Sequence, residues 1–119
     1  MKIHEVAARD GLQNEKTIFS TDQKMRLLEL LAQTKPDSLE VTSFVRADRV
    51  PQFADAVELC HRLKSAEWRE GIPLVGLVMN MRGFLFNCAY QALKRSRIRW
   101  IFFFHALYSW EIICRIKTR

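Results

Sequence analysis

An arginine and an aspartate stand side by side just after the first predicted strand, and a glutamate interrupts the second. Arg9 and Asp10 follow the strand-like run of residues 2–7, and Glu40 lies between two aliphatic residues of a later strand. A carboxylate can bind a hard divalent cation. A guanidinium can stabilise an oxyanion that the same cation polarises. These residues are therefore candidates for metal-assisted chemistry.

Each candidate also has a purely structural interpretation. Arg9 and Asp10 could form a surface ion pair in a polar loop, and Glu40 could occupy a solvent-facing position of its strand. However, a carboxylate inside an apolar run is costly unless it is paired or functional. If Glu40 faces the interior of a barrel, it could meet Arg9.

The elements that must position these residues follow a strand-helix-strand-helix-strand order. The predicted strands are residues 2–7, 38–44 and 74–79, and the predicted helices run from Thr21 to Pro36 and over 50–63. Gly11 is expected to supply the turn after the first strand, and Thr21 to cap the first helix. The continuous apolar run of the third strand is typical of a parallel sheet. The sequence thus predicts an α/β parallel sheet with its site at the carboxyl ends of the strands.

The C-terminal part differs in composition. Residues 1–83 hold equal numbers of basic and acidic side chains, whereas residues 84–119 hold seven basic and one acidic, so the net charge of +6 lies wholly there. The same segment carries nine of the 13 aromatic residues. A helix over 89–94 and a strand over 98–104 are predicted within it. We interpret 84–119 as a divergent basic and aromatic tail, which a shifted reading frame, a retained intron or an alternative exon could encode.

The length of the chain, its cysteine spacing and its hydropathy exclude several classes of protein. The 119 residues are too few for a complete eight-stranded α/β barrel, which needs roughly 200–250. Three widely spaced cysteines form no metal-binding or disulfide pattern, which indicates a reducing compartment. No targeting segment is readable, so a cytoplasmic location is expected, or a mitochondrial origin if the N-terminus is truncated. The apolar run 100–110 is shorter than the roughly 20 residues of a membrane span.

The motifs resemble a known family. Residues 5–16 (EVAARDGLQNEK) are similar to the opening of 3-hydroxy-3-methylglutaryl-CoA lyase, a member of the DRE-TIM metallolyase superfamily. Residues 39–45 and 50–55 supply a second match, and residues 80–84 a weaker third. The resemblance covers about residues 3–84. It implies an α/β fold in which 1–83 form about the first three βα units of a TIM (β/α)8 barrel, which is incomplete.

The resemblance also implies an activity and roles for residues. A divalent Mg or Mn ion would chelate the hydroxyl and carbonyl oxygens of an acyl-CoA substrate, and cleavage would yield acetyl-CoA and acetoacetate. Asp10 would be a metal ligand. Arg9 would bind substrate and stabilise the enolate, Gln13 would bind substrate, and Glu40 would act in catalysis by holding Arg9 in position.

The sequence departs from the family in ways that affect this prediction. Ala8 stands where the family usually has proline. The family's later His-x-His metal pair, Asn ligand and cysteine in a glycine-rich loop have no counterpart, since His4, His61 and His105 are isolated. The remaining metal ligands are therefore absent from this chain, and we expect it to be inactive alone. Its open sheet edge favours homo-oligomers or association with a full-length lyase subunit.

Two other classes of function stay open. The chain could be an interaction or regulatory fragment that pairs with a complete lyase, or a fragment of a related metallolyase acting on another acyl-CoA or a pyruvate-type substrate. The basic tail could instead bind nucleic acid or a membrane surface. No RNP, zinc or helix-turn-helix pattern accompanies its charges, so no nucleic-acid partner is expected.

Overall fold

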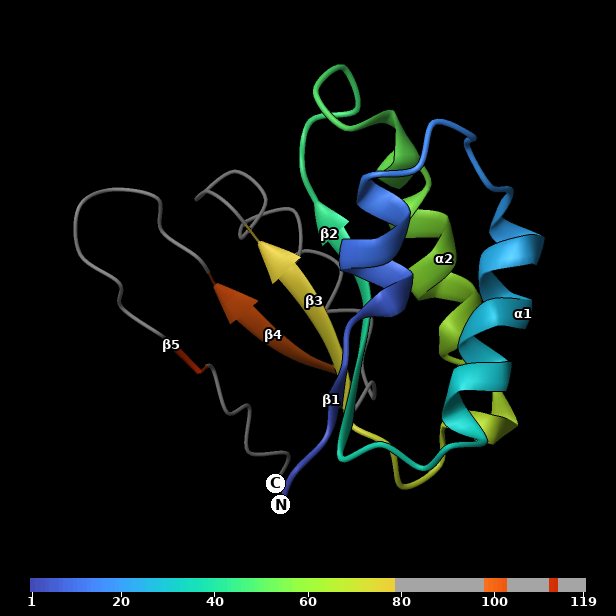
Figure 1. Cartoon of the computed structure of the whole chain (residues 1–119), viewed down its shortest axis with the longest axis vertical. Coiled ribbons are helices and arrows are strands. Elements are labelled where there is room, and N and C mark those ends of the chain that lie inside the picture. Colours follow the sequence, from blue (N-terminus) through green and yellow to red (C-terminus); the bar gives the residue numbers. More distant parts are fainter. Residues whose placement is uncertain (79–97, 103–111, 114–119) are drawn as a thin grey trace.

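The computed structural model describes residues 1–78, 98–102 and 112–113 (Figure 1). The strands, in chain order, are β1 (His4–Glu5), β2 (Ser38–Phe44), β3 (Leu74–Val78), β4 (Ile98–Phe102) and β5 (Ile112–Ile113). The helices are α1 (Thr21–Ala32) and α2 (Ala56–Leu63), with a π-helical segment η1 (Ala7–Gly11) and two 3₁₀ turns, η2 (Pro51–Phe53) and η3 (Glu67–Arg69).

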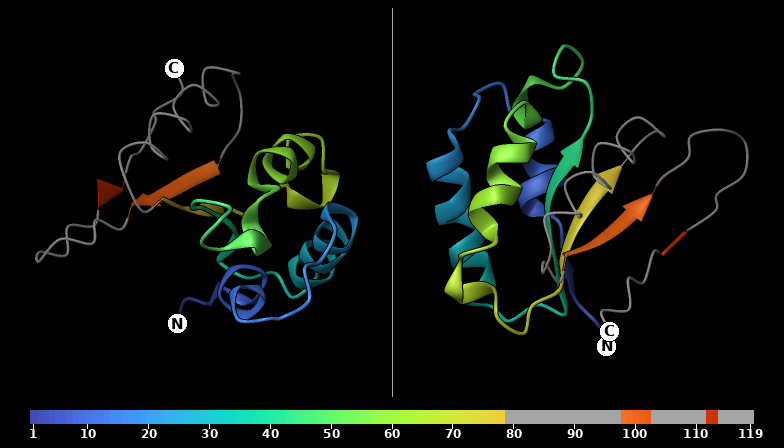
Figure 2. Two further views of the ribbon diagram at one scale, coloured as in Figure 1. Left: turned by 90° about the horizontal axis from the view of Figure 1, so that it is seen from above. Right: turned by 180° about the vertical axis from the view of Figure 1, so that it is seen from behind.

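The strands form one sheet in the order in which they occur along the chain. β1 to β4 pair in parallel, and β5 pairs antiparallel with β4. Both α1 and α2 lie on the same side of the strands (Figures 1 and 2). Sequential parallel strands with their helices in one outer layer are the arrangement of an α/β barrel rather than of a doubly wound sheet. The predicted parallel α/β class is confirmed.

The element boundaries follow the predictions closely in the later strands, whereas β1 spans only His4–Glu5 and not the predicted residues 2–7, because the chain winds into η1 from Ala7. β2 has the predicted bounds. β3 is buried along its whole length, as its apolar run indicated. β4 begins at the predicted Ile98, and its observed end at Phe102 borders residues outside the described part. The helix predicted over 89–94 also falls outside the described residues.

The prediction for the N-cap of α1 is wrong by one residue. Ser20 caps the helix: its hydroxyl accepts a hydrogen bond from the Gln23 backbone N–H at 3.2 Å, and Gln23 Oε1 accepts one from the Ser20 N–H at 2.8 Å. This reciprocal pair is a capping box. Thr21 is the first helical residue, and its hydroxyl donates instead to Asp55 at 2.6 Å.

The continuous helix predicted over 50–63 is also wrong at its start. Pro51 begins a separate 3₁₀ turn, and α2 starts only at Ala56. The proline ring fixes its own backbone angle and removes an N–H donor, which suits the first turn of a short helix. The Asp55 side chain does not cap α2 and bonds to α1 instead.

The core lies between the sheet and the helix layer. It consists of fully buried aliphatic side chains from both layers, among them Leu28 of α1, Leu59 and Leu63 of α2, Leu39 of β2 and Leu74 of β3. Because Leu39 and Leu74 are register partners and both pack in this core, the adjacent pair Glu40 and Val75 points to the opposite face of the sheet.

Candidate active site

η1 carries the Arg-Asp pair immediately beyond β1. The N–H groups of Arg9 and Asp10 both donate to the Val6 carbonyl, at 3.0 and 2.7 Å. Gly11 ends η1 with no positive φ, and an added Cβ would meet only the Ala7 Cβ at 4.0 Å. The prediction that Gly11 supplies a turn is therefore wrong: the chain reverses by winding into a helix, which any small residue could do here.

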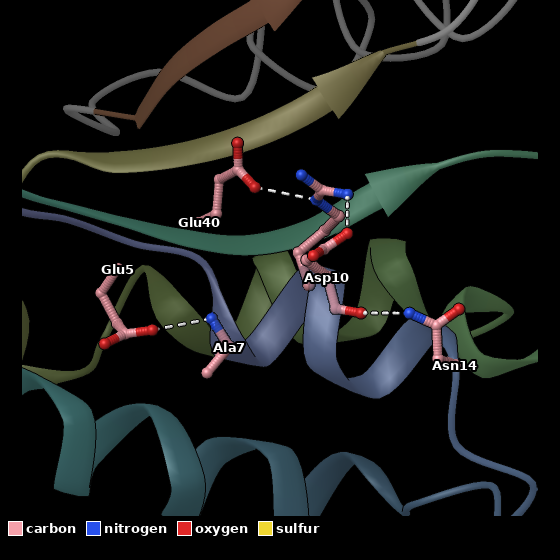
Figure 3. Close-up of polar contacts among 6 residues, drawn as sticks. Glu5, Ala7, Asp10, Asn14 and Glu40 are labelled. Atoms are coloured by element: carbon pink, nitrogen blue, oxygen red, sulfur yellow. Dashed lines mark hydrogen bonds and ion pairs between the residues drawn. The ribbon is translucent and has the colours of Figure 1, made fainter.

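Two polar side chains that the sequence analysis missed frame η1 (Figure 3). Glu5 Oε1 accepts a hydrogen bond from the Ala7 N–H at 2.8 Å. Asn14 Nδ2 donates to the Asp10 carbonyl at 3.3 Å. Their signal in the sequence is weak, because both contacts depend on a π-helical segment that no spacing rule predicts. Together they fix the two ends of the segment that carries Arg9 and Asp10.

Arg9 and Glu40 form an ion pair between η1 and β2. Arg9 Nε donates to Glu40 Oε2 at 2.8 Å (Figure 3). Their side chains are only 17% and 12% exposed, so the contact is shielded from water. The structure therefore brings together the two residues that the sequence analysis expected to meet, and Glu40 does not occupy a solvent-facing position.

Asp10 completes the cluster on its open side. Arg9 Nη1 donates to Asp10 Oδ1 at 3.0 Å, and the Asp10 side chain is 60% exposed. Arg9 thus uses Nε and Nη1 on the two carboxylates, whereas its Nη2 donates to no group in the described part of the chain. A guanidinium held in this way keeps donors free for an external oxyanion.

The cluster fits a divalent cation only in part. Asp10 presents a carboxylate to solvent, the ligand chemistry that Mg or Mn prefers. The Glu40 carboxylate already accepts from Arg9. Within residues 1–78 and the short described strands, no group of three or more His, Cys, Asp or Glu residues is placed to hold a metal. Asp10 therefore fits as one ligand of a larger set.

Gln13 lies near in sequence but is not joined to the cluster. It follows η1, is exposed, and its side chain makes no hydrogen bond to any described residue. Gln13 is thus free to contact a ligand, while its predicted role has no further support from the geometry.

Buried hydroxyls further along β2 also escaped the sequence analysis. Thr42 Oγ1 and Ser43 Oγ are buried without a hydrogen-bond partner in the described structure. A bulge between Glu40 and Thr42 pairs Ser43 with Leu77. Glu40 pairs with Val75, and because Val75 and Leu77 are two residues apart on β3, Ser43 lies on the same face of the sheet as Glu40. Sequence alternation alone would have placed them on opposite faces.

The matched proteins are lyases, and the match is partial. No family model matches the chain. Hydroxymethylglutaryl-CoA lyase, mitochondrial, of Macaca fascicularis is 44% identical over 84 residues, which are 71% of this chain and 25% of that protein. The cytoplasmic 3-hydroxy-3-methylglutaryl-CoA lyase of Mus musculus is 44% identical over 71% of this chain and 24% of its own length. The chain thus spans about a quarter of the length of these relatives.

Solved structures agree with the sequence matches. The HMG-CoA lyase from Brucella melitensis has a TM-score of 0.66 and 38% identity, over 76% of this chain and 31% of its own. An HMG-CoA lyase from Acinetobacter baumannii, in complex with coenzyme A and 3-methylmalate, has a TM-score of 0.67 and 32% identity over 77% of this chain and 29% of its own.

The described residues therefore have the fold of part of a parallel α/β barrel, which they share with these solved lyases. Within that class, the matched residues belong to the hydroxymethylglutaryl-CoA lyase family. Curated members include mitochondrial and cytoplasmic forms. Across the described residues, no helix is both long and apolar enough to span a bilayer.

Proposed function

We propose that this chain supplies the first part of a metal-dependent carbon–carbon lyase site, which cleaves 3-hydroxy-3-methylglutaryl-CoA to acetyl-CoA and acetoacetate. The observation that carries the proposal is the shielded Arg9–Glu40 ion pair, with Asp10 exposed beside it. The matched relatives support the proposal, because they are named as lyases for this substrate.

Each residue has a role that follows from its contacts. Glu40 orients the Arg9 guanidinium through Nε, so Glu40 is a positioning residue. Arg9 binds the substrate and stabilises the enolate oxygen that develops on the acetyl thioester side, through the donor that the carboxylates leave free. Gln13, which is exposed, binds substrate at the rim.

Asp10 would hold Mg or Mn through its exposed carboxylate. The bound ion would polarise the substrate's hydroxyl and carbonyl oxygens. Arg9 Nη1 donates to Asp10 Oδ1, which holds this carboxylate beside the guanidinium. Further metal ligands would have to come from beyond the described residues.

The 119-residue polypeptide by itself is expected to be inactive. One exposed carboxylate binds a divalent cation weakly, and the barrel closure that excludes water is missing from the described part. The purified chain, assayed with 3-hydroxy-3-methylglutaryl-CoA and added Mg or Mn, should release no acetyl-CoA above the blank. Robust turnover that disappears in Arg9→Met would refute this expectation of inactivity while supporting the site.

A second candidate is an interaction or regulatory fragment that associates with a full-length lyase subunit. The observation that favours it is apolar surface just before β1, in the segment that precedes α1, and on α1, where Ile3, Ile18 and Leu30 respectively are about half exposed. Co-purification with a full-length lyase would support it. A chain that stays monomeric in the presence of that lyase would exclude it.

The origin of residues 84–119 and the compartment are further proposals. The shift to basic and aromatic composition supports a divergent segment that begins near 84, encoded by a shifted frame or another exon. A search of the encoding DNA in all frames for a lyase-like peptide tests this, and finding none would overturn it. A cytoplasmic location is tested by imaging a tagged chain against a mitochondrial marker.

A further inference from the structure

Two adjacent hydroxyls near the end of β2 are buried, and the strand turns them to opposite faces of the sheet. Thr42 is 0% exposed and Ser43 is 1% exposed, and neither hydroxyl makes a hydrogen bond within the described part of the chain. Leaving a buried hydroxyl unpaired costs free energy, so each such group in a native protein needs an explanation. The two faces of the sheet give the two hydroxyls different surroundings.

The Thr42 hydroxyl lies on the helix face. Thr42 pairs with Gly76 of β3, and the residues two positions before and after Gly76 are Leu74 and Val78, which both belong to the core under the helices. Side chains two residues apart on a strand share a face. Thr42 therefore faces the core, on the side of the sheet opposite Glu40.

The Ser43 hydroxyl lies on the face that carries the Arg9–Glu40 ion pair. Simple alternation would put Thr42 on this face, but the bulge between Glu40 and Thr42 puts Ser43 there instead. Bulges recur next to active sites, where they change the direction of a side chain. Figure 3 shows Glu40 first and Asp10 further on in the direction of the β2 arrowhead. Since Ser43 follows Glu40 in that direction, it lies toward the end of the strand where Asp10 lies.

The neighbours of Ser43 across this face of β3 are apolar. Its register partner is Leu77, and the partner of Glu40 is Val75. Both aliphatic side chains are buried, and neither belongs to the core cluster under the helices. They offer a hydroxyl neither a donor nor an acceptor, and the Glu40 carboxylate is bonded to Arg9. A ligand bound on this face can supply the partner that the Ser43 hydroxyl lacks among the described residues.

We propose that the Ser43 hydroxyl donates a hydrogen bond to the terminal carboxylate of the substrate's acyl group. In the proposed function, the metal ion takes the substrate's hydroxyl and carbonyl oxygens and Arg9 takes the enolate oxygen, so this carboxylate is the polar group of the acyl chain that is left without a partner. The inference rests on the proposed function and adds to it a residue that selects acyl-CoA substrates by their terminal carboxylate.

Burial makes this contact selective. Arg9, Glu40 and Ser43 are all shielded from water, so a hydrogen bond from Ser43 would form in a shielded place. A hydrogen bond to a charged oxygen is stronger than one between neutral groups. A site built around such a bond rejects a ligand that lacks the acceptor, because its buried donor is then left unpaired.

The test uses two substitutions that remove a buried hydroxyl from adjacent positions, Ser43→Ala on the site face and Thr42→Val on the helix face. In the 119-residue chain, neither variant should unfold at a lower urea concentration than the parent, because each loses an unpaired buried group. This measurement establishes that both variants are folded, and Thr42→Val is the matched control for the loss of a hydroxyl.

Activity is measured in the Bacillus subtilis HMG-CoA lyase in which residues 1–78 of this chain replace the aligned segment, with Mg present. Ser43→Ala should lower kcat/KM for 3-hydroxy-3-methylglutaryl-CoA by about 10- to 100-fold, the loss expected for a hydrogen bond to a charged group. Thr42→Val should keep the parent value. Inhibition by 3-hydroxy-3-methylbutyryl-CoA, which lacks the terminal carboxylate, should be the same in Ser43→Ala as in the parent.

Three results would overturn the proposal: an unchanged kcat/KM in Ser43→Ala, an equal loss in Thr42→Val, or an equal weakening of both thioesters by Ser43→Ala. A parent chimera that binds 3-hydroxy-3-methylglutaryl-CoA without cleaving it would count against the proposed function alone. Calorimetry then decides the inference: binding at least tenfold weaker in Ser43→Ala than in Thr42→Val supports it, and equal binding, or none to the parent, overturns it.

Discussion

Two of the ion pairs that link neighbouring elements, Lys24–Asp55 and Arg9–Glu40, use their donors differently. Lys24 of α1 is 4% exposed and bonds to Asp55 Oδ1 at 2.5 Å and to the Gln52 carbonyl, with its ammonium 6.0 Å from the centre of the Phe53 ring. Arg9 of η1 bonds to Glu40 and Asp10 and keeps Nη2 free within the described residues.

The difference separates a structural pair from a candidate site. Lys24 turns inward, and Asp55 is further held by Thr21 at 2.6 Å, so this network ties α1 to the start of α2. Arg9 turns toward the face opposite the helices, and its neighbour Asp10 is mostly exposed. A buried charge whose hydrogen bonds join two helical segments serves the fold, because losing one partner leaves the other charge buried and unpaired. A shielded charge with a free donor is available to a ligand.

The largest expected effect on stability is at Lys24. Lys24→Met leaves Asp55 without its cation in a mostly buried position, and removing one partner of a buried pair typically costs about 3–5 kcal/mol. We expect about 3 kcal/mol from urea unfolding, because Asp55 keeps its bond to Thr21. Arg26→Met, in an exposed pair on the same helix, should change stability by less than about 0.5 kcal/mol. Equal losses of stability in the two variants would contradict the contrast between the buried pair and the exposed one.

Arg9→Met should cost less than Lys24→Met. It leaves the Glu40 carboxylate without its partner, but Arg9 and Glu40 retain some access to water, so we expect about 1–2 kcal/mol by urea unfolding. A loss as large as that of Lys24→Met would make Arg9 a structural brace rather than part of a site.

Asp10→Asn should affect metal binding and hardly affect folding. Asp10 is 60% exposed, so the free energy of unfolding should stay within about 0.5 kcal/mol of the parent. Weak Mn²⁺ binding, followed by broadening of backbone NMR signals near η1, should fall at least tenfold. Unchanged broadening in the variant would show that the ion binds elsewhere.

The smallest effect concerns Cys60, which is fully buried in the core. Burial, with a smaller contribution from the nearby Asp55 charge, raises the pKa of the Cys60 thiol to about 12. The thiol should therefore resist iodoacetamide at about pH 8.5, where an unfolded thiol is half ionised. Mass spectrometry of the Cys60 peptide should show modification only in concentrated guanidinium chloride, and rapid modification of the folded chain would contradict this burial.

The raised pKa of the Cys60 thiol also predicts the direction in which stability changes with pH. Because the folded thiol holds its proton more tightly than the unfolded one, its contribution to stability is complete below about pH 8.5 and is lost as the pH rises toward 12. Cys60→Ala should remove this part of the alkaline slope. A slope that is identical in the variant would assign it to other groups.

Local patterns were sufficient to predict the sheet but not the details of the site. The β-branched run of β2 and the apolar run of β3 determine strand type and burial directly, so both were predicted correctly. The π-helical η1 is framed by local contacts from Glu5 and Asn14, but no spacing rule predicts such a segment. The N-cap of α1 is Ser20, through a capping box with Gln23, whereas the Thr21 hydroxyl bonds to Asp55, 34 residues away, a contact that leaves no local periodicity.

The residue types of the site could be predicted from the sequence, but the way in which they are arranged could not. A carboxylate inside an apolar strand indicated that Glu40 needed a partner, and Arg9 proved to be that partner. The exposure of Gln13 and the shared face of Glu40 and Ser43 depend on the η1 winding and the β2 bulge. A bulge changes which side chains share a face, and no alternation in the sequence reports it.

We propose that Arg9 acts on a substrate oxyanion, whereas the ion pairs of the helix layer maintain the fold. The most direct test is acetyl-CoA release by the Bacillus subtilis HMG-CoA lyase in which residues 1–78 of this chain replace the aligned segment, with Mg present. We predict that this chimera cleaves 3-hydroxy-3-methylglutaryl-CoA, that Arg9→Met lowers kcat by about 10²–10³-fold, and that Arg26→Met retains the parent rate. A folded chimera without activity, or one in which Arg9→Met keeps the parent kcat, would contradict the claim.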